Sequence, residues 1–217
     1  MTRDGLAEYY ARRASEYDSI YMKPERQADI GDLASRLGEI LAGRTILEVA
    51  CGTGFWTQFL APRAASILVT DINPEMLEIA RRRLHGSPNV SFQRADALTL
   101  RDVGGGYTGC LAAFWWSHLR KDRVRSFLEV LHSRLAHRAR VVFADNVYVE
   151  GSSTPISRTD ADGNTYQMRR LMDGSSHEVL KNFPSESEFL RATAEFGRGA
   201  GFCTLKYFWY GWYELPE

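Results

Sequence analysis

The chain has 217 residues, of which 44% are apolar, enough for one domain with a sizeable core. Its 27 basic and 27 acidic side chains give a formal net charge of zero, which argues against nucleic-acid binding driven by charge. No stretch approaches the roughly 18 apolar residues of a membrane helix, and the polar first residues do not resemble a secretory signal. The 3 cysteines form no C-x-x-C pair. We therefore expect a cytoplasmic protein, without a metal site, that binds neither nucleic acid nor membrane.

The N-terminal segment, residues 3–42, predicts two helices with a break near Pro24. Tyr10 and Tyr17 are seven residues apart, so they share one helix face, which Tyr21 extends. Packing on a sheet and contact with a ligand both remain open for these tyrosines.

From about residue 44, short β-branched runs alternate with segments of helical periodicity, which is typical of a parallel sheet flanked by helices. Asn73-Pro74 marks the start of one helix and Gly86 its end. Apolar residues from Val124 to Leu135 predict another helix between strands four and five. The five expected strands are residues 45–49, 66–70, 90–93, 110–114 and 140–144.

Residues 152–183 interrupt this alternation. Asp162-Gly163 and Asp173-Gly174 are each flanked by strand-like residues, which predicts β-hairpins inserted after strand five. Strand alternation places Tyr166 and Arg170 on one face of a hairpin, and Arg169 on the other.

The C-terminal part begins with a helix, because Ser185 and Glu188 form a capping box ahead of an apolar face that extends to Phe196. The aromatic stretch from Thr204 to Leu215 is expected to supply the last two strands.

A glycine-rich turn, Glu48–Gly54, follows the first strand. Gly52 and Gly54 let the backbone turn sharply and approach a ligand closely, although turns need glycine for other reasons too. Asp71 ends the second strand about twenty residues later, where an acid can accept the two hydroxyls of a ribose. Asp96 follows the third strand. Three acids therefore end three successive parallel strands, at the edge of the sheet where ligands bind.

These motifs, Ile46–Gly54, Val69–Leu77 and Phe92–Ala97, resemble the first three motifs of the class I S-adenosylmethionine-dependent methyltransferases of small-molecule type, in the same order and spacing. Ala50 replaces the usual third glycine, and Thr57 disfavours a nicotinamide dinucleotide, which would require glycine or alanine there. The resemblance implies S-adenosyl-L-methionine as the cofactor. It implies cofactor contacts from Tyr17, Tyr21, Glu48, Ala50, Gly52, Gly54, Asp71, Ile72, Met76, Asp96, Ala97 and Phe114.

The expected architecture is α/β, with a Rossmann-like, seven-stranded, mostly parallel sheet and helices on both faces. We expect one domain, built from an N-terminal helical lid (1–42), a cofactor-binding core (43–150), an inserted β-hairpin region (151–184) and a terminal helix with a β-hairpin (185–217). The assembly is expected to be a monomer or a homodimer.

The acceptor side is expected where strand four ends, next to the transferred methyl group. His118 is the histidine nearest to this point and is the candidate general base, with helix capping or a supporting role as the alternative. Trp115 and Trp116 follow the same strand and are expected either to form a wall of the cleft or to pack in the core. The remaining candidates for acceptor binding are Asn146, Tyr166 and Arg170.

The sequence thus favours methyl transfer to an oxygen or nitrogen atom of a small-molecule acceptor. Two alternatives remain, a methyltransferase acting on RNA or protein and a non-catalytic cofactor-binding protein. The neutral charge balance argues against the first. The intact Gly52, Gly54 and Asp71 argue against the second, although they indicate binding rather than turnover.

Overall fold

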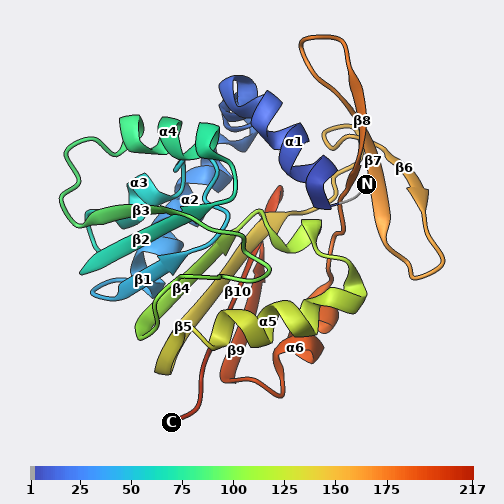
Figure 1. The fold of residues 1–217 in the computed structure, drawn as a ribbon. Coiled ribbons are helices and arrows are strands. Elements are labelled where there is room, and N and C mark those ends of the chain that lie inside the picture. The colour runs from blue at the N-terminus through green and yellow to red at the C-terminus, as the bar shows by residue number, and fades with distance from the viewer. Residues whose placement is uncertain (1–2) are drawn as a thin grey trace.

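The computed structural model describes residues 3–217, with side chains from residue 5 onward. Its centre is a seven-stranded sheet with the order β3-β2-β1-β4-β5-β10-β9 (Figure 1). Strands β3, β2, β1, β4 and β5 are parallel to one another, and β10 and β9 are antiparallel to their neighbours. The predicted Rossmann-like, mostly parallel sheet is therefore confirmed. The strands are β1 (Thr45–Glu48), β2 (Ser66–Asp71), β3 (Val90–Arg94), β4 (Tyr107–Ala113), β5 (Leu135–Asn146), β9 (Arg198–Thr204) and β10 (Phe208–Glu214).

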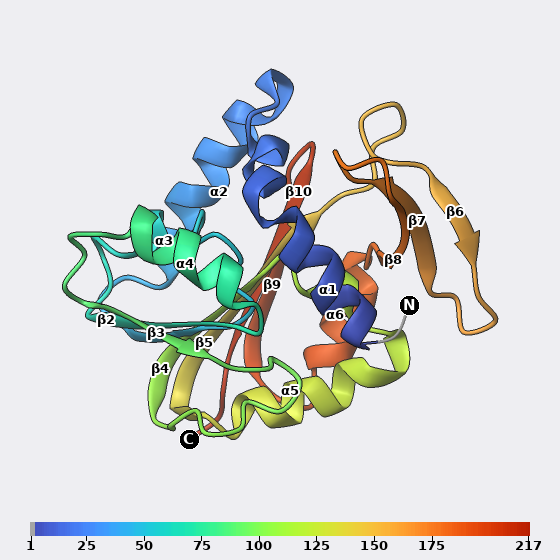
Figure 2. The same ribbon diagram turned by 45° about the horizontal axis from the view of Figure 1, so that its top comes forward.

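Helices cover both faces of this sheet, as expected. One side carries α2 (Gln27–Ile40), α3 (Thr57–Leu60) and α4 (Pro74–Arg83), and the other carries α5 (Val124–His132) and α6 (Glu186–Thr193) (Figures 1 and 2). In β1, Ile46 packs into the core on the α2 side, whereas Leu47 packs into the core against α5 and α6. Both are fully buried. Because the strands are covered on both faces, their sequences are continuous apolar runs.

The N-terminal segment forms α1 (Arg3–Arg13) and two 3-10 helices, η1 (Ala14–Tyr21) and η2 (Pro24–Arg26). Pro24 begins η2, which agrees with the expected break. In Figure 2, α1 crosses the centre of the view between α4 and a second, smaller sheet. None of the helices in the described residues is long and apolar enough to span a bilayer.

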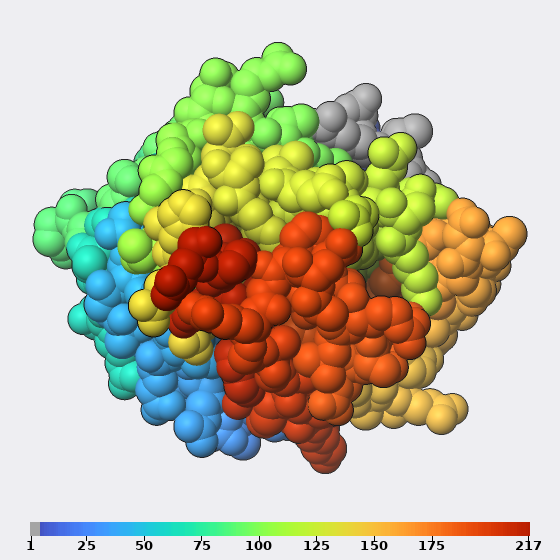
Figure 3. Space-filling view, turned by 90° about the horizontal axis from the view of Figure 1, so that it is seen from below, coloured from blue at the N-terminus to red at the C-terminus, as the bar shows by residue number. Residues whose placement is uncertain are grey.

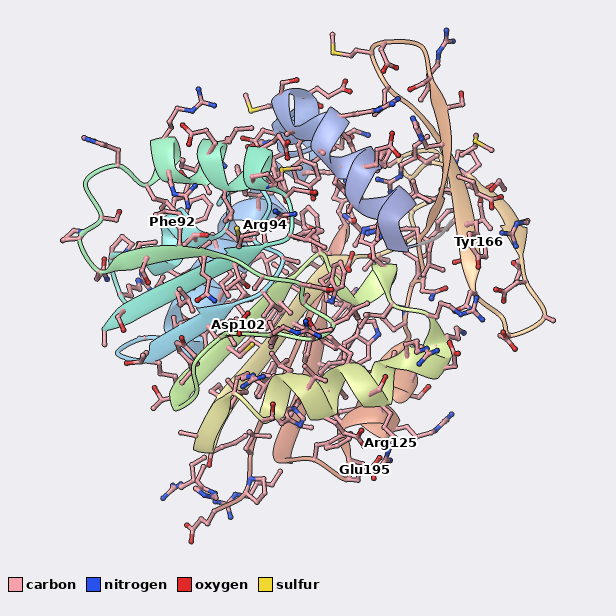
Figure 4. The ribbon with its side chains drawn as sticks, in the orientation of Figure 1. Phe92, Arg94, Asp102, Arg125, Tyr166 and Glu195 are labelled. Carbon is pink, nitrogen blue, oxygen red and sulfur yellow. The ribbon has the colours of Figure 1, made fainter. Side chains whose placement is uncertain are left out.

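The second sheet consists of three antiparallel strands inserted after β5, namely β6 (Ile156–Thr159), β7 (Thr165–Arg170) and β8 (Ser176–Leu180). Both expected turns are present, and Gly163 and Gly174 adopt positive φ there, which glycine tolerates without strain. Figure 4 places Tyr166 on this sheet, on the opposite side of the molecule from Phe92 of β3.

Two element boundaries differ from the expectation. Helix α5 ends at His132, and Leu135, predicted to lie on its apolar face, instead begins β5. Arg138, at a positive φ of 57°, lies early in this strand, and the strand is continuously buried from Val141 to Asp145. An apolar residue at helical spacing is therefore no proof of helix when the next strand begins within one turn.

The last two strands also begin earlier than expected. The capping box of Ser185 and Glu188 is confirmed, but α6 ends at Thr193 rather than extending to Phe196, and β9 occupies the glycine-rich segment Arg198–Thr204. Glycine is unfavourable in strands, so this segment gave no strand signal. Gly201 is required here because a Cβ atom would lie 2.3 Å from the Trp212 ring on β10. Figure 3 shows these C-terminal segments covering the underside of the molecule beside the segment around α5.

Candidate active site

A cavity opens at the carboxyl ends of the central strands, where strand order reverses between β1 and β4. This is the position at which α/β sheets of this type bind ligands. Residues from α1 and η1 form its cover. Most of the predicted cofactor-contacting residues line the cavity together: Tyr17, Tyr21, Ala50, Gly52, Asp71, Ile72, Met76, Asp96, Ala97 and Phe114.

Asp71 holds the glycine-rich turn and the start of α4 together. Its Oδ2 atom accepts the Gly52 N–H at 2.9 Å, and its Oδ1 atom accepts the Asn73 N–H at 2.8 Å. Burial raises the pKa of this carboxyl to about 6, although the backbone donors at Asn73 and Gly52 lower it. Asn73 occupies the N-cap position of α4 but makes no side-chain capping bond, contrary to expectation. The hydrogen bond from this region to Asp71 comes from the N–H group of Asn73 itself.

The turn adopts left-handed backbone conformations at three positions. Gly52 and Gly54 have φ of 57° and 70°, and Ala50 has φ of 52°. An L-residue pays about 1–2 kcal/mol for this conformation, whereas glycine adopts it freely. Ala50 therefore keeps the backbone path that a glycine would take, at a local cost in strain. Phe114, where β4 ends beside the cavity, has the same strained geometry with φ of 59°.

Glu48 and Gly54 are the two predicted cofactor residues that do not line the cavity. The Glu48 carboxyl is fully buried beneath the turn, and this burial raises its pKa to about 8. Gly54 lies against α4, where a Cβ atom would be 3.1 Å from the Cβ of Ala80. These positions support the turn from behind.

The N-terminal segment is fastened to the turn by polar and aromatic contacts. Asp18 accepts a hydrogen bond from the Thr53 hydroxyl at 2.6 Å and pairs with Arg83 of α4. The rings of Tyr17 and Tyr21 are 6.0 Å apart, and Tyr21 stacks on Phe55 at 3.8 Å. The lid therefore closes over the turn through residues of η1.

His118 lies at the other end of the cavity, in the short helix η3 (Trp116–His118). Its Nδ1 atom lies 2.8 Å from the carbonyl oxygen of Leu180, which can only accept, so Nδ1 carries the proton. Its Nε2 atom then accepts the hydroxyl proton of Tyr10, also at 2.8 Å. Burial and the nearby Lys181 ammonium lower the pKa of His118 to about 3. The imidazole is therefore neutral, and both its nitrogens are engaged.

The two tryptophans after β4 differ in location. Trp115 lines the cavity, whereas Trp116 is buried in the core against Phe143, Phe189 and Trp209. Trp115 thus forms part of the cleft wall, and Trp116 packs in the core, so each of the two interpretations holds for one tryptophan.

Asn146, Tyr166 and Arg170 do not line the cavity. Tyr166 donates its hydroxyl to Asp160 and lies beneath the guanidinium of Arg158 at 3.7 Å. Arg170 is exposed, whereas its neighbour Arg169 faces inward toward the N-terminal tyrosines. The inserted sheet therefore directs a different arginine toward the site.

No sequence pattern pointed to Lys181, which is buried next to the site. Its Nζ atom donates to Asp145 at 2.8 Å and to the Ser117 hydroxyl at 2.6 Å. The lysine follows the strand-like residues Val179 and Leu180, a position where a buried charge indicates a specific partner. Tyr10, for which ligand contact had been left open, lines the cavity too, as does Trp56, which was not assigned to the site.

Comparison with known proteins agrees with this geometry. The model of the family described as a methyltransferase domain matches residues 46–138. Demethylmenaquinone methyltransferase of Clavibacter sepedonicus is 43% identical over 60 residues, which are 28% of this chain and 24% of that protein. Malonyl-[acyl-carrier protein] O-methyltransferase of Serratia marcescens is 28% identical over 83 residues, 38% of this chain and 31% of that protein. The matched region thus spans about a third or less of these relatives' lengths.

Solved structures match nearly the whole chain. A DhpI–SAH complex superposes with a TM-score of 0.79 at 28% identity, covering 99% of both chains. A DhpI–SAM–HEP complex superposes with a TM-score of 0.75 at 29% identity, covering 98% of this chain and 99% of DhpI. Together with the glycine-rich turn and Asp71 at the end of β2, these matches show that the chain belongs to the class I S-adenosylmethionine-dependent methyltransferases.

Proposed function

We propose that this chain transfers the methyl group of S-adenosylmethionine to an oxygen or nitrogen atom of a small-molecule acceptor. The observation that carries this proposal is the Asp71 carboxylate, which lines the cavity beside a glycine-rich turn that allows close backbone approach. The two DhpI complexes, which contain SAH or SAM in the same fold, support it.

The cavity fits the cofactor at each of its parts. Asp71 would accept the ribose hydroxyls, because it lines the cavity and an ionised carboxylate forms strong charge-assisted hydrogen bonds. Asp96, Ala97 and Ile72 would frame the adenine. Gly52 would admit the methionine end, since a Cβ atom there would lie 3.9 Å from Tyr17 and fill the space between turn and lid.

Catalysis would come mainly from positioning. When bound, S-adenosylmethionine supplies an electrophilic methyl group with a good leaving group, so the protein must mainly align the acceptor and exclude water. The aromatic rings of Tyr17, Phe114 and Trp115 line the cavity and are suited to surround a sulfonium. The cover formed by α1 and η1 shields the cavity from solvent.

Two assays test the proposal. The first is calorimetric titration of the protein with S-adenosylmethionine. The second is incubation with methyl-labelled cofactor and a fractionated cell extract, followed by identification of the labelled product. Label in a low-molecular-weight product is expected. Label found in RNA or protein alone, or binding without any transfer, would contradict the proposed activity.

The affinity for S-adenosylmethionine should depend on pH through Asp71. Its ionised form accepts the ribose hydroxyls, and its pKa lies at about 6. Affinity should therefore be complete above pH 7 and should fall as pH decreases through 6, by about tenfold at pH 5, where about a tenth of the carboxyl is ionised. Calorimetry at pH 5, 6 and 8 measures this dependence. Asp71→Asn should bind more weakly but without the change between pH 5 and pH 8. The same slope in both proteins would exclude Asp71 as its source.

His118 is expected to act as a positioning residue for Tyr10 rather than as the base first suggested by its place in the sequence. A neutral imidazole with both nitrogens engaged and a pKa of about 3 is a poor proton acceptor. His118→Ala and Tyr10→Phe should lower kcat by similar, moderate factors that do not multiply in the double variant. The pH profile of kcat should lack a limb near 6.5. A loss of about a hundredfold or more in His118→Ala alone, with such a limb in the parent enzyme, would indicate a general base.

A further inference from the structure

Three basic side chains meet beside the cavity, where α1, β7 and β8 come together. Arg13 ends α1, Arg169 belongs to β7, and Lys181 follows β8. Arg13 and Arg169 both act electrostatically on Tyr10, and Lys181 acts on His118. Tyr10 and His118 line the cavity, whereas the three basic residues do not, so the charges lie behind this part of its wall.

The charge of this cluster is only partly neutralised by the protein. Lys181 is paired with Asp145, and both are almost completely buried. Within the part of the chain that the structure describes, neither Arg13 nor Arg169 has a carboxylate within 4.0 Å. Arg13 lies 5.3 Å from the centre of the Tyr17 ring. Two positive charges therefore lack a protein counter-charge.

The arginines also present hydrogen-bond donors that no described residue accepts. The Nη1 atom of Arg13 and the Nε atom of Arg169 are buried without a protein partner, although Nη2 of Arg169 donates to Gln167 at 2.8 Å. Leaving a buried charged donor without a protein acceptor is unfavourable. Burial and the two arginines together lower the pKa of Lys181 to about 8, a sign of crowded positive charge.

We propose that Arg13, Arg169 and Lys181 form a subsite that binds an oxyanion of the acceptor, so that the substrates are small organic acids. This inference rests on the proposed methyl transfer and assigns its substrate class. Guanidinium groups match carboxylates and phosphorus oxyanions through charge-assisted, often bidentate hydrogen bonds. The same cluster repels a protonated amine.

The subsite joins the lid to the inserted sheet. Arg13 is carried by α1 and Arg169 by β7, and the apolar residues Tyr9, Leu171 and Val179 pack between these elements. An anion held by both arginines would tie the lid to the sheet next to His118. Binding of an organic acid at the subsite would thereby also favour the closed cavity.

The subsite is tested with two probe anions, malonate and inorganic phosphate. Each variant of a subsite arginine is compared with a control variant of a neighbouring arginine. Arg169→Gln is compared with Arg170→Gln, because Arg170 is the exposed neighbour on the same strand. Arg13→Gln is compared with Arg12→Gln, because Arg12 is exposed and paired with Glu8. Anion affinity is measured by calorimetry and by the rise in Tm, with and without S-adenosylhomocysteine.

The wild-type protein should bind at least one probe, and its Tm should rise with probe concentration. Arg169→Gln and Arg13→Gln should weaken binding by about tenfold or more, while the two control variants bind as the wild type does. Tighter binding of malonate would identify carboxylic acids as the substrates, and tighter binding of phosphate would identify phosphorus oxyacids.

A second measurement separates binding from a structural role. Without anions, Arg169→Gln should have a Tm equal to or above that of the wild type, because one of two repelling charges is removed. A lower Tm with unchanged anion affinity would overturn the proposal. So would equal affinities in Arg169→Gln and Arg170→Gln, or failure of the wild type to bind either probe. Failure to bind S-adenosylhomocysteine would instead refute the proposed function, since anion binding is measured without it as well.

Discussion

Replacing Asp71 by alanine should weaken S-adenosylmethionine binding by about a hundredfold or more. Each hydrogen bond to a charged group contributes roughly 1.5–3 kcal/mol, and two ribose hydroxyls would lose their acceptor. The substitution also frees the N–H groups of Gly52 and Asn73, which loosens the turn. Calorimetry with the wild type and Asp71→Ala measures the difference.

The control for this variant is Glu78→Ala, on the helix that follows Asp71. Glu78 is exposed, and its distance from Arg82 is 4.0 Å, so its removal should leave cofactor affinity unchanged. Equal affinities in the wild type and Asp71→Ala would contradict the ribose assignment. A loss shared by both variants would point to a general effect on α4.

Replacing Lys181 by methionine should destabilise the fold by about 3–5 kcal/mol, because it leaves the Asp145 carboxylate buried without its counter-charge. Asp145 has no exposed surface, and Lys181, together with backbone donors such as the Ser117 N–H, holds its pKa below the usual range against the effect of burial. In a chain of this length, Tm should fall by roughly 10 °C. Thermal unfolding followed by circular dichroism measures this change.

The double variant Asp145→Asn/Lys181→Met should recover much of this loss, because it removes both buried charges together. Lys121→Met is the matched control, since Lys121 forms a half-exposed pair with Glu188 and should contribute at most about 1 kcal/mol. A Tm for Lys181→Met close to that of Lys121→Met would show that the buried pair is energetically unimportant. No recovery in the double variant would show that the loss comes from packing instead.

Local signals made most of the core predictable. The apolar runs of β1, β2 and β4 are continuous because helices cover both faces of the sheet, and this pattern is independent of what packs against each strand. Asp162-Gly163 and Asp173-Gly174 mark hairpins because the turn itself requires these residues. Segments whose strand character depends on a partner were not predictable. Arg198–Thr204 becomes a strand because Gly201 accommodates Trp212 of β10.

The sequence alone determined the turn at Gly52 and Gly54 and the acid Asp71, because short-range backbone chemistry and the spacing of successive strands govern both. Only the tertiary structure decided which distant side chains meet. Tyr10 and His118 are 108 residues apart, and Asp145 and Lys181 are 36 apart. Alternation along β7 placed Arg169 and Arg170 on opposite faces, but packing against α1 determined that Arg169 faces inward. Local patterns define the faces of an element, whereas burial against its neighbours selects the face that reaches the site.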